Sequence, residues 1–290
     1  MNNGKAGKLI ISLILIILVL IGIYVINSTI LNSNGYQAPD YPKTDITALL
    51  KQDSFTDADY KELFFQTGLG RSAIDSILQQ PNGATTIIRY QENFFTERTV
   101  STITPWKIVK NEYTVNASGG TINAFDIAPY DNGYILIRSS AHTLGWRHGH
   151  AGLIVDAEKG LVLEAVTIGQ NSKLRDINSW RYRPTFIMLK LKDDSPAAAE
   201  IGDQIAQFAN DHLVDLPYRL TVGLFSDKNP DPADIKYTQC SHVVWYPYNL
   251  FGYDIDADGG WLVLPEDIAK SDLLEVVQIY GFDPNDFWRD

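Results

Sequence analysis

Cysteine is nearly absent from this chain, with one copy among 290 residues. A single thiol excludes any disulfide within the chain and leaves that thiol free. Cys240, in "YTQCSHVVWYPY", therefore needs another reason to be present. Two interpretations are open for it: a small buried hydrophobic residue, which is what most lone cysteines are, or a reactive nucleophile.

Positive charge is also scarce, because 24 lysines and arginines stand against 35 aspartates and glutamates, a net charge of −11. Nucleic-acid binding needs clustered basic side chains to neutralise phosphates, so we expect no nucleic-acid partner. An acidic protein also gains little from an anionic membrane surface. With 45% hydrophobic residues, the chain is long enough for one good-sized core and a smaller second unit.

Charge is missing altogether from Leu9–Ile26, "LIISLILIILVLIGIYVI", which is long enough to cross a bilayer as a helix. Lys5 and Lys8 precede it, as in both a secretory signal and an uncleaved anchor. Its length and the lack of a small-residue cleavage pattern after it favour the anchor. We therefore expect residues 1–35 to be a cytoplasmic stub, a single transmembrane helix and a linker, with the rest of the chain extracytoplasmic at the cell membrane.

Residues 36–120 are predicted to form an N-terminal extension that packs on the main domain. Two helices are expected in it, over 54–70 and 71–80, because hydroxyl and acidic residues begin the first segment and glycines end it. Residues 85–109 are rich in β-branched and aromatic side chains and are predicted to be β-structure.

Residues 121–290 are predicted to form an α+β domain built on a small antiparallel sheet with packed helices. Four apolar segments that are close in sequence predict a meander of strands over 134–139, 150–156, 161–168 and 185–192. Helices are predicted over 195–213 with Ser195 as N-cap, from Thr238 to Pro247, and over 264–271, and a last strand over 274–281.

Cys240 falls at the start of one predicted helix, with Thr238 available as its N-cap. The amides and the dipole of a helix start favour a thiolate, and an activated thiol needs a base within hydrogen-bond reach, usually a histidine. His148 and His150, in "GWRHGHAGLIVD", head a predicted strand, where a spacing of two places both on the same face. Alternation alone does not choose between them.

Glu164 interrupts the apolar strand "LVLEAV", where a carboxylate is costly unless something pairs with it. If the two strands are neighbours, one of the two histidines is the natural partner. Cysteine, histidine and carboxylate together make the general catalytic triad. The alternative is that a single glutamate in a strand faces solvent at the edge of a sheet.

The remaining histidines favour structural interpretations. His142 and His148 suit polar surface or loop positions, and His242 lies two residues after Cys240 on a helix, which points it away from the thiol. A zinc site made of His142, His148 and His150 matches no strong ligand spacing, so we expect no metal and no cofactor.

The segment Asp254–Gly259, "DIDADG", matches the first half of a calcium-binding loop with carboxylates at alternate positions. The full loop requires a glutamate at its twelfth place, where Pro265 stands, and Glu266 is one residue late. A solvated turn is therefore the default interpretation.

The order of these segments resembles a known family. "HAGLIVD", "LVLEAV", an amphipathic helix, "LPYRL", "YTQCSHVVWYPYNLFGYDIDADGG" and "LPEDI" resemble the circularly permuted NlpC-type papain-like hydrolases of the YiiX/YaeF-like group, over residues 128–282. The resemblance implies that Cys240 is the nucleophile, that His150 is its base, that Glu164 orients the imidazole, and that Tyr218 lies near the nucleophile. The chain departs from the family at Cys-Ser-His, where Cys-Ser-Glu is common, and at "YILIRSS", where "GDILL" is common.

The resemblance further implies a permuted papain-like fold and a membrane-anchored cysteine peptidase or amidase that forms an acyl-thioester. Its substrate would be a peptide or another amide, such as a cell-wall peptide, and no cofactor is implied. Two alternatives stay open. One is a lipid acyltransferase or hydrolase of the same fold with an apolar trench lined by Trp245, Tyr246 and Tyr248, and the other is a catalytically inactive binding module.

Overall fold

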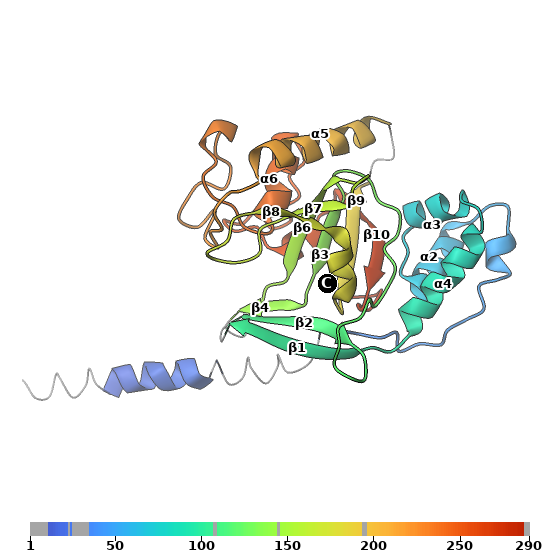
Figure 1. Cartoon of the computed structure of the whole chain (residues 1–290), viewed down its shortest axis with the longest axis horizontal. Helices are drawn as coiled ribbons and strands as arrows, with labels where there is room; N and C mark the ends of the chain where they lie inside the picture. The colour runs from blue at the N-terminus through green and yellow to red at the C-terminus, as the bar shows by residue number, and fades with distance from the viewer. Residues whose placement is uncertain are drawn as a thin grey trace, which may run out of the picture.

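The computed structural model describes residues 11–22, 24, 35–106, 109–143, 146–192 and 196–286. Residues 11–22 are helical (Figure 1). Their side chains are exposed. Within the described residues, no helix is both long enough and apolar enough to cross a bilayer. The predicted anchor Leu9–Ile26 lies partly outside these residues, so it stays a prediction.

A six-stranded antiparallel sheet forms the centre of the molecule (Figure 1). Its strands, in spatial order, are β10 (Leu274–Tyr280), β9 (Phe186–Leu191), β3 (Ile135–Arg138), β6 (His150–Asp156), β7 (Leu161–Glu164) and β8 (Lys173–Asp176). The predicted antiparallel α+β architecture is confirmed, and β3, β6 and β7 follow one another as expected. The predicted position of β9 is wrong, because this strand pairs with β3 rather than β7. Its burial on both faces explains the central place, whereas the polar β8, which the sequence did not indicate, takes the edge.

Helices α5 (Pro196–His212) and α6 (His242–Leu250) pack against each other and against β6 (Figure 1). The short helix α7 (Pro265–Ala269) packs near β3. The predicted helix over 195–213 is confirmed, although Ser195, its expected N-cap, lies outside the described residues. These helices bring the C-terminal third of the chain onto the strand that begins with His150.

The N-terminal extension contributes η1 (Leu49–Lys51), α2 (Asp57–Thr67), α3 (Arg71–Leu78) and α4 (Gly83–Phe95), which lie beside β10 (Figure 1). Thr56 and Asp59 form a capping box at the start of α2, and Gly68, with φ 71°, ends it in the left-handed conformation. The backbone N–H of Gly70 donates to the Val277 carbonyl of β10 at 2.9 Å. The extension is therefore attached to the edge of the central sheet.

The prediction of β-structure over residues 85–95 is wrong, because α4 occupies this segment. Its buried side chains lie at helical spacing, at Ile87, Tyr90, Gln91 and Phe94, and they face α2 and α3. The β-branched and aromatic composition indicated strands, but burial of this stripe outweighs that weak local preference.

A second sheet joins the two parts of the chain. Its strands are β1 (Thr99–Trp106), β2 (Val109–Val115), β4 (Ala141–Thr143) and β5 (Trp146–Arg147), in that order. Strand β2 of the extension pairs with β4 of the main domain. The predicted domain boundary at residue 120 therefore separates strands that belong to one sheet. Strands β4 and β5 connect β3 to β6, so this second sheet lies beside the end of the central sheet that carries His150.

Candidate active site

Cys240 precedes α6, which begins at His242 rather than at Thr238. The predicted role of Thr238 as N-cap is wrong, because its hydroxyl contacts His242 Nδ1 at 3.0 Å. Ser241 is the N-cap and makes no side-chain capping bond, and the Oε1 of Gln239 accepts the backbone N–H of Ser241 at 2.9 Å. The same oxygen accepts the Cys240 thiol at 3.4 Å, so Gln239 fixes both the turn and the sulfur.

The Cys240 thiol is free and buried, with 6% of the residue exposed. Burial raises the pKa of the thiol, and the backbone N–H of Ala151, the Ser241 hydroxyl and the charge of Arg138 oppose this rise only in part. The expected thiolate is therefore corrected to a resting thiol, because desolvation outweighs the nearby donors.

His150 and Glu164 are brought together. Their contact, from His150 Nε2 to Glu164 Oε2, measures 2.7 Å, and both side chains are almost completely buried. The register of β6 and β7, with Leu153 opposite Leu163, makes them diagonal neighbours on one face of the sheet. The edge-of-sheet alternative for Glu164 is wrong, since the residue is 5% exposed.

Trp180, from the 3-10 helix η2 (Ile177–Tyr182), completes this arrangement. Its ring stacks on the His150 imidazole, with centroids 5.6 Å apart, and its Nε1 donates to Glu164 Oε1 at 3.2 Å. Gly152 makes the approach possible, because a Cβ there would lie 3.0 Å from the Trp180 ring and 2.8 Å from Val162 Cγ1. The Glu164 carboxylate thus fixes the rings of His150 and Trp180 relative to each other.

The hydrogen bond to Glu164 selects the tautomer of His150. In the neutral ring, Nε2–H donates to the carboxylate, which leaves Nδ1 as the proton acceptor. Burial lowers the pKa of His150 to about 4, although Glu164 acts in the opposite direction. The imidazole is therefore neutral at physiological pH and able to take up a proton.

Arg138 is a residue that the sequence reasoning missed. It lies directly opposite His150 in the β3–β6 pair and is 4% exposed. Its Nη1 donates to Asn111 Oδ1 at 3.3 Å and to Ser140 Oγ at 3.1 Å, both uncharged acceptors. Burial lowers the pKa of Arg138 to about 9, so it stays a cation beside Glu164 and Cys240. A charged residue inside the apolar segment "YILIRS" was the available signal, as it was for Glu164.

The thiol lies next to the strand that begins with His150. It faces the backbone N–H of Ala151, the next residue of β6. Within the described residues, however, the sulfur has no hydrogen bond to the His150 ring and donates to Gln239. Tyr218 is brought to the same place: it forms a β-bridge with Thr238, and burial together with the thiol raises its pKa above the usual range. Bonds between catalytic groups are often long before substrate binds.

The other histidines are placed as follows. His148 precedes β6, and Gly149, with φ 71°, breaks the alternation that would have placed it on the same face as His150. The expectation of a surface position for His142 is wrong, because this residue is 1% exposed and its Nε2 contacts Glu112 Oε1 at 3.2 Å. His242 is structural as expected, bonded to the Lys228 carbonyl and stacked on Tyr246.

The aromatic residues of α6 do not form a trench. Trp245, Tyr246 and Tyr248 are all buried in the core, and each uses its polar atom on a partner. Their acceptors are Asp254, the Pro230 carbonyl and the Gly133 carbonyl, respectively. The suggested apolar lining beside Cys240 is therefore not made by these rings.

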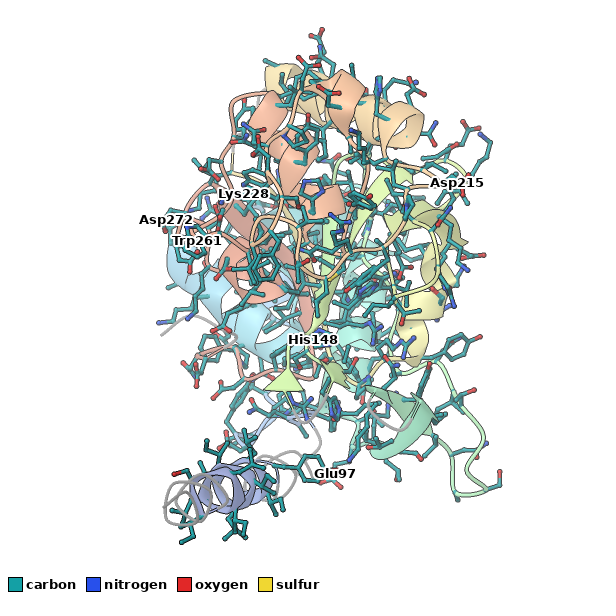
Figure 2. All side chains as sticks on the ribbon, turned by 90° about the vertical axis from the view of Figure 1, so that its left-hand side faces the viewer. Glu97, His148, Asp215, Lys228, Trp261 and Asp272 are labelled. Atoms are coloured by element: carbon teal, nitrogen blue, oxygen red, sulfur yellow. The ribbon has the colours of Figure 1, made fainter. Side chains whose placement is uncertain are left out.

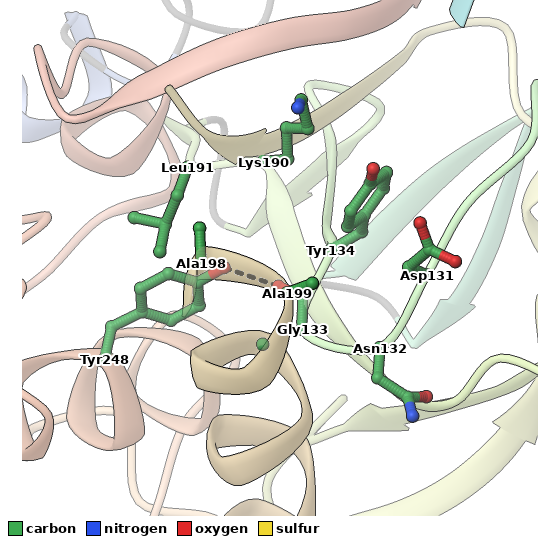
Figure 3. A pocket seen from close by; sticks show the side chains of 10 residues that line it. Asp131, Asn132, Gly133, Tyr134, Lys190, Leu191, Ala198, Ala199 and Tyr248 are labelled. Atoms are coloured by element: carbon green, nitrogen blue, oxygen red, sulfur yellow. Dashed lines mark hydrogen bonds between the residues drawn. The ribbon is translucent and has the colours of Figure 1, made fainter. Parts of the chain in front are cut away.

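A pocket of about 200 Å³ lies at the opposite end of β3, where Tyr248 meets Gly133 (Figure 3). Its lining includes Asp131, Tyr134 and Lys190 but neither a cysteine nor a histidine. This pocket is away from Arg138 and His150, which end and begin their strands at the other side of the sheet. It adds nothing to the candidate site.

Comparison of the chain with protein-family models, with curated proteins and with solved structures found no match.

Proposed function

We propose that this protein is a cysteine hydrolase that cleaves an amide bond through an acyl-thioester, with Cys240 as nucleophile and His150 as base. The observation that carries the proposal is the buried 2.7 Å contact between His150 and Glu164, which leaves Nδ1 of the ring as proton acceptor beside the strand residue that faces the thiol. A buried carboxylate, imidazole and thiol on adjoining elements match the arrangement that nucleophilic catalysis requires.

The reaction then follows from the protonation states. Cys240 Sγ attacks the carbonyl carbon while its proton passes to His150 Nδ1, and Glu164 stabilises the imidazolium that forms. The charge of Arg138 and the backbone N–H of Cys240 stabilise the oxyanion. His150 returns the proton to the leaving amine as the C–N bond breaks. Water then attacks the thioester and gives a proton to His150, the C–S bond breaks to release the carboxylic acid, and His150 returns that proton to the sulfur.

The resemblance noted in the sequence supports a peptide substrate, including a cell-wall peptide, and a permuted papain-like fold. The uncharged N-terminal segment supports a single-pass membrane anchor with the catalytic part extracytoplasmic. Tyr218, whose pKa responds to the thiol, is suited to contact substrate next to the nucleophile.

The test is hydrolysis of a panel of peptide and amide substrates, followed by mass spectrometry of the intact protein. Wild type is expected to release product and to carry an acyl group on Cys240 during turnover. Cys240→Ala is expected to do neither while keeping its thermal unfolding temperature. His212→Ala, at an exposed histidine of α5, is the matched control and is expected to keep full activity. Full turnover by Cys240→Ala would end the proposal.

A further inference from the structure

An acidic cluster lies beyond the candidate active site. Asp256 and Asp258, from the loop after α6, and Asp267, from α7, place one carboxylate oxygen each within 4.8 Å of one another. The calcium-loop pattern lacked a glutamate at its twelfth place. The fold supplies a third carboxylate from Asp267 instead, which the sequence pattern could not show.

The state of Asp256 is the second observation. Its side chain is fully buried, and Lys228 Nζ binds Oδ2 at 2.6 Å, but Oδ1 has no hydrogen-bond partner among the described residues. A buried carboxylate oxygen without a donor is strongly unfavourable. Since one ammonium faces three carboxylates, the cluster also keeps an excess of negative charge.

The other two carboxylates each have one oxygen already engaged with the backbone. Asp258 Oδ1 accepts the Gly260 N–H at 2.7 Å, and Asp267 Oδ2 accepts the Leu264 N–H at 2.7 Å. These bonds fix the two side chains and leave the second oxygen of each available. One oxygen of each carboxylate therefore lies within 4.8 Å of the others, and one of the three groups is the buried Asp256 carboxylate, whose Oδ1 lacks a partner among the described residues.

We propose that Asp256, Asp258 and Asp267 bind a calcium ion. The cluster offers oxygen atoms alone, which hard divalent cations prefer, and no thiolate or imidazole is part of it. Calcium accepts an irregular ligand set completed by water and carbonyl oxygens, whereas magnesium demands near-ideal octahedral geometry. The proposal does not depend on the hydrolase activity.

Calcium binding would also act on the turn that holds Cys240. Gln239, the acceptor of the thiol, donates its Nε2 to the Val263 carbonyl at 2.9 Å. Val263 lies on the chain between Asp258 and Asp267. An ion bound by both aspartates therefore restrains the Val263 carbonyl, and through it the Gln239 side chain that accepts the thiol. Figure 2 shows Lys228 and Trp261 on the same face of the molecule, and the backbone of Gly223 lies close to both.

The experiment is calorimetric titration of the full chain in detergent with calcium chloride, after removal of divalent ions by chelation. One ion per chain is expected. Asp258→Asn is expected to weaken binding about tenfold or more, because one ligand charge is lost. This variant keeps an acceptor for the Gly260 N–H at an exposed position, so its fold is preserved. Asp231→Asn, an exposed aspartate that caps η3 (Pro232–Asp234), is the matched control and should bind as wild type does.

Terbium gives a second readout, because the indole of Trp261, 74% exposed in the same loop, can sensitise its luminescence. Wild type and Asp231→Asn should show terbium emission that calcium competes away, and Asp258→Asn and Asp267→Asn should show far less. Absence of a calcium heat up to millimolar concentration would overturn the proposal. Equal affinity in wild type, Asp258→Asn and Asp267→Asn would overturn it as well.

Discussion

Glu164 is the residue on which the geometry of the site depends. Each of its oxygens accepts from one ring, His150 at 2.7 Å and Trp180 at 3.2 Å, and the two rings stack on each other. A carboxylate buried without such donors would be unstable, so the two rings explain its presence in an apolar strand. Its negative charge also favours the imidazolium that the proposed reaction forms.

Trp180→Phe tests whether this arrangement orients the imidazole. The substitution keeps a ring over His150 but removes the N–H that Glu164 accepts. A hydrogen bond to a charged group is worth about 1.5–3 kcal/mol, so kcat is expected to fall about tenfold with little change in KM. Trp245→Phe, which loses a bond of the same kind to Asp254, should keep its kcat. Equal loss in both variants would indicate a general packing effect.

The buried imidazole predicts an unusual acid limit of activity. Because burial lowers the pKa of His150 to about 4, the base stays unprotonated at all higher pH values. We expect kcat/KM to be nearly constant from about pH 5 to neutrality and to fall as pH decreases through about 4. A pH profile that instead falls near the ordinary histidine value of about 6.5 would contradict this assignment.

At the scale of elements, Glu112 of β2 connects the second sheet to the site. Its carboxylate contacts His142 of β4, accepts two bonds from Arg147 of β5, and accepts the backbone N–H of Gly35 at 3.2 Å. Asn111, the adjacent residue, accepts from Arg138. The strands that hold the buried arginine are thus tied to the backbone of Gly35.

Glu112→Gln is expected to lower the free energy of unfolding at neutral pH and to make that free energy depend less on pH in the acid range. Burial alone would raise the pKa of Glu112, but His142 and Arg147 lower it to about 2. The folded-state pKa lies below the unfolded one, so this stabilisation is complete above about pH 4.5 and is lost as pH falls towards 2. The shift corresponds to about 3 kcal/mol, measurable by urea unfolding at pH 7 and pH 3. The same loss at both pH values would contradict the electrostatic origin.

Gly152→Ala tests the fit of β6 against η2. The added Cβ would lie 2.8 Å from Val162 Cγ1, 3.0 Å from the Trp180 ring and 3.2 Å from Glu164 Cγ. Overpacking of this kind costs about 1–3 kcal/mol and should displace Trp180 from Glu164. Lower stability together with a lower kcat is expected, measured by thermal unfolding and by turnover. An unchanged kcat would show that the position of Trp180 is not critical.

Much of the fold follows from local patterns, and the exceptions have physical reasons. Strand β6 and helix α2 were predictable because a short continuous apolar run and a capping box act over a few residues. Helix α4 was not, since its composition favours strands while its burial stripe depends on partners far along the chain. In the site, the contact of Glu164 with a histidine was predictable from the cost of its burial. Trp180 was not, because its approach depends on the absent side chain of Gly152.

At the scale of the whole molecule, the second sheet lies beside the central sheet (Figure 1), and the contact of Arg138 with Asn111 joins the two. If Leu9–Ile26 anchors the chain, the full protein should sediment with membranes and resist extraction by carbonate. The same chain beginning at Gly35 should stay in the supernatant. Equal distribution of both forms would contradict the anchor.

The central claim is that His150 is the base of Cys240, and it can be tested without a known substrate. The measurement is the rate of Cys240 alkylation by iodoacetamide against pH in wild type and His150→Ala, with His212→Ala as control. The raised pKa of the thiol predicts that labelling increases into the alkaline range in every form. At neutral pH, wild type and His212→Ala should react at least about tenfold faster than His150→Ala, because the neutral imidazole accepts the proton of the resting thiol as the sulfur attacks. Identical rates in wild type and His150→Ala would contradict the account.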